Sequence, residues 1–141
     1  MNSGTLHLND LLITLPVLTH KPGDLIIAEP RKICLNFFHS APRVYWIINN
    51  TEQEVERGGH CHPQGGKREI MICLSGLANV ELHCLQFCTH VTLDSPKQGL
   101  LVPNMLWHKV RLAPGAILLS IASTERSSDE CIDKMPCNCP Q

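Results

Sequence analysis

The sequence predicts an all-β fold, either a sandwich or a barrel, built from roughly ten short strands. Short runs of apolar, β-branched or aromatic residues recur along the chain, and Gly, Pro and Asn gather in the turns between them. No stretch sustains an apolar period of 3.6 residues, apart from one turn of helix that we expect at residues 128–135. Short strands at regular spacing, without helices between them, are typical of antiparallel sandwiches and barrels.

The first third of the chain predicts three short apolar segments. Residues 6–18 alternate apolar and polar side chains loosely, which indicates an edge strand, and residues 21–24 (Lys-Pro-Gly-Asp) carry a turn signal. Residues 25–29 predict a short strand, and residues 34–38 form another short apolar piece.

The remaining two thirds predict the main sheets. Residues 43–48 are β-branched and aromatic, which is the composition of a strand, and the chain returns over residues 56–62. Residues 69–75 form an apolar run that ends at Gly76, so we expect a strand buried on both faces. Further strands are expected at residues 79–84, 90–93, 99–102, 107–112 and 117–122.

Length and charge limit the classes of function. The 141 residues fit one domain, with a motif-bearing core at about 22–125 and a tail at 126–141. A formal charge of −1 without a Lys/Arg cluster argues against a nucleic-acid or membrane-surface partner, although one or two arginines would suffice for an anionic small molecule. The sequence shows no signal peptide and no apolar run near the ~20 residues of a membrane span, so we expect a cytoplasmic protein.

The eight cysteines are scattered, and no pair has the C-x-x-C spacing of a zinc ribbon. In a cytoplasmic chain of this size we expect most of them to be reduced thiols packed as small hydrophobic groups.

Three histidines and one glutamate are the candidate catalytic or metal-binding residues of the chain. His60 and His62 are one residue apart, so an extended strand places both imidazoles on one face and directs Cys61 to the other. Glu69 opens the buried apolar strand, and His108 follows a proline turn. Imidazoles and a carboxylate suit iron, manganese, nickel or zinc, and imidazoles also transfer protons near neutral pH.

The order His60-x-His62, Glu69, Gly76, Pro103 and His108 resembles the pattern of the cupin superfamily. The resemblance implies a double-stranded β-helix, or jelly-roll, barrel. In metal-binding cupins, the three histidines and the glutamate coordinate one divalent ion. The interval between His62 and Glu69 is longer than in the usual motif, and we expect residues 63–66 to absorb the excess as a hairpin loop.

Finer details resemble one branch, the nucleotide-sugar 3,4-ketoisomerases, which act on dTDP-4-keto-6-deoxyglucose. The resemblance covers about residues 22–125 and is carried by Gly23-x-Leu25 with Glu29, Arg43-Val44-Tyr45, Arg57-Gly58-Gly59-His60-x-His62, Leu93-Asp94-Ser95-Pro96, Gly99-Leu100, Pro103 with Trp107-His108, and Ala122-Ser123. It implies a cytoplasmic homodimer that moves the keto group of a dTDP-linked 4-keto-6-deoxy sugar from C4 to C3, in deoxysugar biosynthesis and without a cofactor.

The resemblance also implies roles for single residues. His60 and His62 would move protons between C3 and C4 through an enediol, because groups with a pKa near neutrality perform such transfers best. Tyr45 would act as an acid or as a partner of the oxyanion. The substrate contacts are expected from Arg43, Arg57, Trp107 and His108, although either arginine could instead form a structural salt bridge.

Departures from the family pattern leave two alternatives open. Glu69 stands where the family typically has Gln, which favours a metal-dependent cupin enzyme, an oxygenase or a metal-assisted isomerase, that holds one divalent ion with His60, His62, Glu69 and His108. Trp46 stands where a second Tyr is common, so the functional aromatic residue is open. Arg126 and Glu130-Cys131 replace the usual residues near the end of the chain, which favours a non-catalytic sugar-binding cupin.

Overall fold

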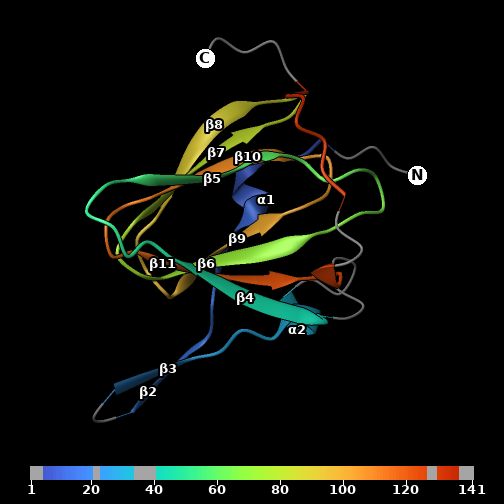
Figure 1. Cartoon of the computed structure of the whole chain (residues 1–141). Helices are drawn as coiled ribbons and strands as arrows, with labels where there is room; N and C mark the ends of the chain where they lie inside the picture. The colour runs from blue at the N-terminus through green and yellow to red at the C-terminus, as the bar shows by residue number, and fades with distance from the viewer. Residues whose placement is uncertain (1–4, 21–22, 34–40, 127–129, 137–141) are drawn as a thin grey trace.

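The computed structural model describes residues 5–20, 23–33, 41–126 and 130–136. Over these residues the chain forms two antiparallel sheets that face each other (Figure 1). The five-stranded sheet has the order β1 (Leu12–Thr14), β9 (Gln98–Val102), β6 (Glu69–Ser75), β11 (Ile117–Ala122) and β4 (Arg43–Ile48). The four-stranded sheet has the order β5 (Val55–His60), β10 (Trp107–Leu112), β7 (Ala78–His83) and β8 (Cys88–Leu93). The predicted all-β fold is confirmed.

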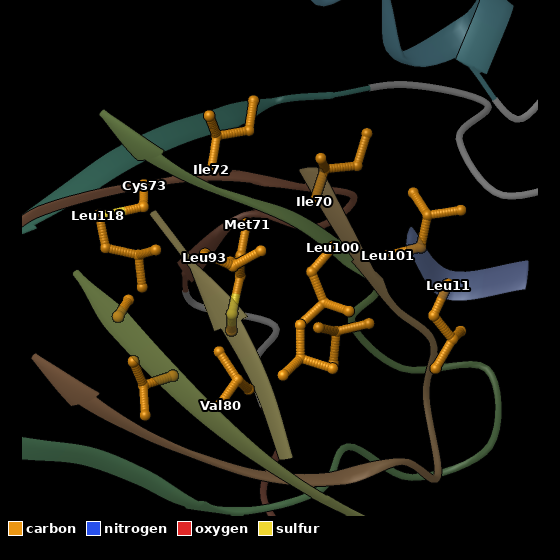
Figure 2. Close-up of a cluster of buried hydrophobic side chains, with 14 of the residues drawn as sticks. Leu11, Ile70, Met71, Ile72, Cys73, Val80, Leu93, Leu100, Leu101 and Leu118 are labelled. Carbon is orange, nitrogen blue, oxygen red and sulfur yellow. The ribbon is translucent and has the colours of Figure 1, made fainter. Parts of the chain in front are cut away.

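The hydrophobic core lies between the two sheets. Figure 2 shows Met71 and Leu118 of the five-stranded sheet in the same apolar cluster as Val80 of the four-stranded sheet. β6 is buried from its first residue through Cys73, which confirms the prediction of a strand with two buried faces. Complete burial of one aliphatic side chain contributes roughly 1.5–3 kcal/mol, so this layer supplies much of the folding free energy.

The edge strand predicted at residues 6–18 is wrong as a single element. The segment contains α1 (Leu8–Leu11), then β1, then β2 (Val17–His20), and β2 pairs with β3 (Gly23–Ile26) in a hairpin that projects from the sheets (Figure 1). Pro16, which has no N–H to donate to a sheet, separates β1 from β2. The strand predicted at residues 25–29 is β3, which starts earlier, at Gly23, and ends at Ile26. The apolar piece predicted at residues 34–38 lies outside the described residues.

The helices are single turns. α1 and α2 (Pro30–Ile33) have four residues each, and no helix among the described residues is long and apolar enough to cross a membrane.

The turn of helix predicted at residues 128–135 is wrong over the described residues 130–135. Instead, Ile132 pairs with Cys61, whose N–H donates to the Ile132 carbonyl at 3.0 Å and whose carbonyl accepts from the Ile132 N–H at 2.8 Å. Because these backbone groups pair with a distant segment, they cannot form a local helical ladder. The C-terminal segment 130–133 therefore lies against the end of β5.

Four cysteines among the described residues are outside disulfide bonds, namely Cys61, Cys73, Cys84 and Cys131. Cys61 is 2% exposed, as expected for a packed thiol. Cys88 differs from the general expectation, since it is disulfide-bonded.

A bulge brings the histidines of β5 and β10 together. The register between the strands shifts at His108 and Lys109, so that His60 lies opposite His108 while Gly58 lies opposite Lys109. Gly58 and Gly59 both have a φ of +84°, and a Cβ on Gly58 would lie 2.9 Å from the His108 carbonyl oxygen. Glycine is therefore required where β5 passes the histidine of its neighbour.

Candidate active site

A cavity of about 200 Å³ lies between the two sheets. β4, β5, β6, β10 and β11 all contribute to its wall, whose residues are Tyr45, Ile47, Arg57, Gly58, His60, Lys67, Glu69, Met71, His108, Val110, Leu118 and Ser120. A second cavity of about 530 Å³ is lined by Arg43, Val44, Tyr45, Trp46, Lys67 and Arg126. The two cavities share Tyr45 and Lys67, so they meet at these two side chains.

The three predicted histidines form one cluster at the small cavity. His60, His62 and His108 each offer a ring nitrogen within 4.8 Å of the others, and the His60 ring centroid lies 4.9 Å from that of His62 and 5.2 Å from that of His108. His60 and His108 line the cavity, whereas His62 is buried beside them with 2% exposure.

Backbone carbonyls orient two of these rings. His62 Nδ1 lies 2.6 Å from the Glu130 carbonyl oxygen, and His108 Nδ1 lies 3.2 Å from the Leu106 carbonyl oxygen. A carbonyl only accepts, so Nδ1 of each of these rings carries a proton. In a neutral His62 this leaves a lone pair on Nε2, whereas His108 Nε2 faces the Glu69 carboxylate at 3.4 Å. His62 Nε2 is buried and has no hydrogen-bond partner among the described residues.

The protein environment favours neutral imidazoles. Burial, followed by the neighbouring His108 and His62, lowers the pKa of His60 to about 4. Burial also lowers the pKa of His62, and this effect exceeds that of the hydrogen bond to the Glu130 carbonyl, which raises the pKa. Both rings are therefore unprotonated at neutral pH, which is the form that accepts a proton.

Glu69 is a buried carboxylate with several partners. Its Oε2 accepts from the Tyr45 hydroxyl at 2.7 Å and from the Ser120 hydroxyl. Its Oε1 lies 3.4 Å from Lys67 Nζ and 3.4 Å from His108 Nε2. Burial alone would raise the pKa of Glu69, but His108, Lys67 and Ser120 hold it well below its usual range, so the group is charged.

Tyr45, not Trp46, is the aromatic residue of β4 that faces the small cavity. Its hydroxyl donates to Glu69 and accepts from Lys67 Nζ at 3.3 Å, whereas Trp46 is 61% exposed. Burial and the Glu69 charge raise the pKa of Tyr45 far above its ordinary value, so the hydroxyl keeps its proton at neutral pH.

The remaining predicted residues divide among three places. Arg43 lines the larger cavity, and Arg57 lines the smaller one, where its Nη1 donates to the Glu56 carbonyl at 2.9 Å. Trp107 does not join them, because alternation along β10 directs it away from the cavity that His108 faces. It is 5% exposed, and its indole N–H donates to the Asp133 carbonyl at 3.1 Å.

The sequence did not predict two of the residues at this site. Lys67 lies two positions before Glu69, a spacing that could have placed it on the same face of an extended chain. Ser120 reaches Glu69 only because β11 lies between β4 and β6, which no local pattern reveals. The expected loop at residues 63–66 is a turn, closed by Gly66 N–H donating to the Pro63 carbonyl at 2.8 Å, but it is not a hairpin, because β5 and β6 lie in different sheets.

The four residues that would hold a metal in a cupin fit that role only in part. The His62 and His108 rings are oriented through Nδ1, as metal-bound imidazoles usually are. Glu69 does not complete the set, since both hydroxyl donors occupy Oε2 and the Lys67 ammonium lies beside Oε1. A fixed positive charge at that place opposes a divalent cation, so the set as a whole does not fit a metal centre.

Comparisons with known proteins agree with this geometry. The family model described as "FdtA: WxcM-like, C-terminal" matches residues 9–135. The TDP-4-oxo-6-deoxy-alpha-D-glucose-3,4-oxoisomerase of Aneurinibacillus thermoaerophilus is 32% identical over 102 residues, which make up 72% of this chain and 69% of the relative.

Two solved structures are also similar. The QdtA 3,4-ketoisomerase from Thermoanaerobacterium thermosaccharolyticum, a double mutant in complex with TDP, has a TM-score of 0.74 and 26% identity, covering 87% of this chain and 86% of its own. The WlaRB TDP-quinovose 3,4-ketoisomerase from Campylobacter jejuni has a TM-score of 0.72 and 25% identity, covering 84% of this chain and 88% of its own. The predicted jelly-roll fold and the predicted family resemblance are confirmed.

Proposed function

The chain belongs to the FdtA family, and from this premise we propose that it is a sugar-nucleotide 3,4-ketoisomerase acting on a TDP-linked 4-keto-6-deoxy sugar. The observation that carries the proposal is the pair of neutral imidazoles, His60 and His62, at a cavity between the sheets, in a chain 32% identical to a TDP-4-oxo-6-deoxyglucose 3,4-oxoisomerase. The product would serve deoxysugar biosynthesis.

The imidazoles account for the proton transfers. His60, which lines the cavity, removes the proton at C3 of the sugar, and the electron pair forms a C3–C4 double bond while the C4 carbonyl becomes an enediolate oxygen. The hydroxyl proton at C3 is then lost, and protons are delivered to C4 and to its oxygen. His62, with an unpartnered Nε2 beside His60, takes part as the second acid/base group.

The two cavities divide the substrate between them. Adjoining cavities of about 200 and 530 Å³ suit a sugar ring in the smaller and a nucleoside diphosphate in the larger. Arg43 in the larger cavity binds phosphate oxygens, while Arg57 and His108 contact the sugar side. Trp107 supports the site from its outer face, since its contacts are with Asp133 and with the ring of His83.

We propose that no cofactor takes part. Glu69 does not complete a set of metal ligands with the three histidines. The conversion of a 4-keto to a 3-keto sugar is also redox-neutral for the molecule as a whole, so it needs no redox cofactor. The metal-dependent alternative is not favoured by the relatives, which are 3,4-ketoisomerases.

We also propose a cytoplasmic homodimer. The outward face of β4 exposes Val44, Trp46 and Ile48 by 53, 61 and 52%, which is unusual for three aligned apolar side chains. The projecting β2–β3 hairpin exposes Leu18 and Leu25 by 47 and 54%. A second copy of the chain that covers such surfaces would remove this apolar area from water.

Proton NMR of dTDP-4-keto-6-deoxyglucose with EDTA-treated protein in D2O tests the proposed reaction. We expect a 3-keto product that carries deuterium at C4, because the returning proton comes from solvent-exchanged imidazoles. Turnover only after addition of Fe, Mn, Ni or Zn would instead support the metal-dependent enzyme. Calorimetric binding without turnover under every condition would support the non-catalytic sugar-binding protein.

A further inference from the structure

We propose that the Lys67 ammonium is the fixed positive charge of this site, which pairs with Glu69 and stabilises the enediolate oxygen of the bound keto sugar. The inference rests on the proposed isomerase function and extends it to a residue outside the histidine–carboxylate motif. Removal of the C3 proton leaves negative charge on the oxygen at C4 until that oxygen is protonated. A positive group already in place stabilises this charge without reorganising in the transition state.

Lys67 lies where the two cavities meet. Its side chain is 7% exposed, and among the described residues it is the one basic residue that lines both cavities. A sugar ring in the small cavity that is joined to a diphosphate in the larger cavity must lie beside this side chain. The ammonium is therefore within the reach of the sugar oxygens.

The contacts of Lys67 leave donor capacity for a substrate. Its Nζ lies 3.3 Å from the Tyr45 hydroxyl oxygen and 3.4 Å from Glu69 Oε1. An ammonium has three N–H donors, so two oxygen contacts leave one donor for a substrate oxygen. Tyr45 in turn donates to Glu69, and these contacts hold the three groups in one geometry.

A purely structural role is the competing explanation. A buried carboxylate such as Glu69, with 1% exposure, needs a compensating charge, and Lys67 provides it whatever the substrate does. Neutralising Glu69 distinguishes the two roles. In Glu69→Gln no buried carboxylate needs a compensating charge. Removing Lys67 from that variant therefore affects only the stabilisation of the enediolate.

The experiment compares Lys67→Met, Lys67→Arg, Glu69→Gln and the double variant Lys67→Met/Glu69→Gln by steady-state kinetics and thermal unfolding. We expect the double variant to unfold near the temperature of Glu69→Gln, while its kcat is about 100-fold lower and its KM changes by less than about threefold. Lys67→Arg should recover part of the kcat lost in Lys67→Met, since it keeps the charge. A double variant with the kcat of Glu69→Gln would overturn the proposal and leave Lys67 a structural role.

Lys97→Met is the matched control. Lys97 Nζ also pairs with a carboxylate, Asp24 Oδ2 at 2.8 Å, but its side chain is 50% exposed and lines neither cavity. We expect this variant to keep the wild-type kcat.

A cobalt titration tests the charge of Lys67 without using turnover. If Lys67 opposes a cation at the three imidazoles, Lys67→Met should bind Co²⁺ at least about tenfold more tightly than the wild type, as followed by visible absorbance. Addition of His62→Asn should abolish the gain. Equal Co²⁺ affinity of the wild type and Lys67→Met would overturn the assigned charge. If the wild type produces no 3-keto sugar, the proposed function fails, and this titration still decides the electrostatic part of the inference.

Discussion

At the scale of single residues, hydrogen bonds to fixed acceptors decide which atom of each polar group is available for chemistry. The Glu130 carbonyl accepts a hydrogen bond from Nδ1–H of His62, and Glu69 accepts one from the Tyr45 hydroxyl. His62 therefore presents a basic nitrogen, whereas Tyr45 presents an oxygen that accepts from Lys67. Tyr45 is better placed to orient Lys67 than to release a proton.

Replacement of either histidine that we propose as a proton-transfer group should lower kcat strongly and preserve the fold. We expect His60→Asn and His62→Asn to lower kcat by about 10²–10⁴-fold, which is the usual contribution of general acid–base catalysis. Circular dichroism and thermal unfolding would verify the fold. His90→Asn, on β8 and outside both cavities, is the control that should leave kcat unchanged.

The pH dependence should reveal the low pKa of His60. Burial lowers this pKa to about 4, from an ordinary value of 6.5, and a general base must be unprotonated. We therefore expect kcat/KM to stay level from pH 7 down to about pH 5 and to fall below that, with a midpoint near pH 4. A midpoint near pH 6.5 would show that the folded protein does not lower the pKa of His60.

The same pKa shift predicts a loss of stability in acid. The folded protein holds His60 neutral between its folded pKa of about 4 and the ordinary 6.5, whereas the unfolded chain binds a proton there. The free energy of unfolding should consequently decrease as the pH falls from about 6.5 to about 4. Urea denaturation at several pH values would measure this slope, and His60→Asn should make it shallower.

At the scale of elements, the bulge between β5 and β10 determines the position of the histidine cluster. Gly58 and Gly59 absorb an extra residue, which places His60 directly opposite His108. The C-terminal segment 130–133 then fixes the far side, through the Cys61–Ile132 pair and the Glu130 carbonyl. Two separate backbone arrangements thus hold the rings of the histidine cluster in place.

Gly58→Ala should destabilise the protein. The new Cβ would lie 2.9 Å from the His108 carbonyl at a φ of +84°, so we expect a cost of about 1–3 kcal/mol in unfolding free energy, with reduced kcat. Gly65→Ala is a matched control, because Gly65 has a φ of +78° but nothing within 4 Å of the added Cβ. An equal loss in both variants would show that backbone strain alone, and not the contact with His108, sets the effect.

At the scale of the whole molecule, two facing sheets enclose the core and leave the small cavity between them. The same architecture ends the five-stranded sheet at β4, an edge strand whose inner face carries Tyr45 and whose outer face carries Trp46. Val44 and Trp46 of that outer face also line the larger cavity, so a contact with a second copy there would border the proposed nucleotide site.

Trp46→Glu combined with Ile48→Glu should shift the protein from dimer to monomer. A charged side chain resists burial in an apolar interface, and these two residues are 61 and 52% exposed on the outer face of β4. Size-exclusion chromatography with light scattering would measure the mass. Leu85→Glu, at an isolated residue that is 82% exposed between β7 and β8, is the control. A wild-type protein that is monomeric at all concentrations would contradict the proposed dimer.

Local patterns in the sequence were sufficient for the strands of the sheets and for part of the site. β4, β6, β10 and β11 begin and end where their composition and flanking turns predict, because strand propensity and turn chemistry are local properties. The spacing of His60 and His62 predicted that these two rings share a strand face, and the resemblance to the cupin pattern implied that His108 joins them, which the structure confirms.

The tertiary structure decided what depends on pairing between distant segments. Tyr45 and Ser120 join Glu69 only because β4, β11 and β6 lie side by side, and the sequence around each residue carries no trace of that order. Residues 130–135 form no helix because the backbone of Ile132 pairs with Cys61, some seventy residues earlier. Fold class and the candidate site residues are thus encoded locally, whereas the hydrogen-bond partners that come from other strands are fixed by long-range strand pairing, because pairing depends on the whole chain.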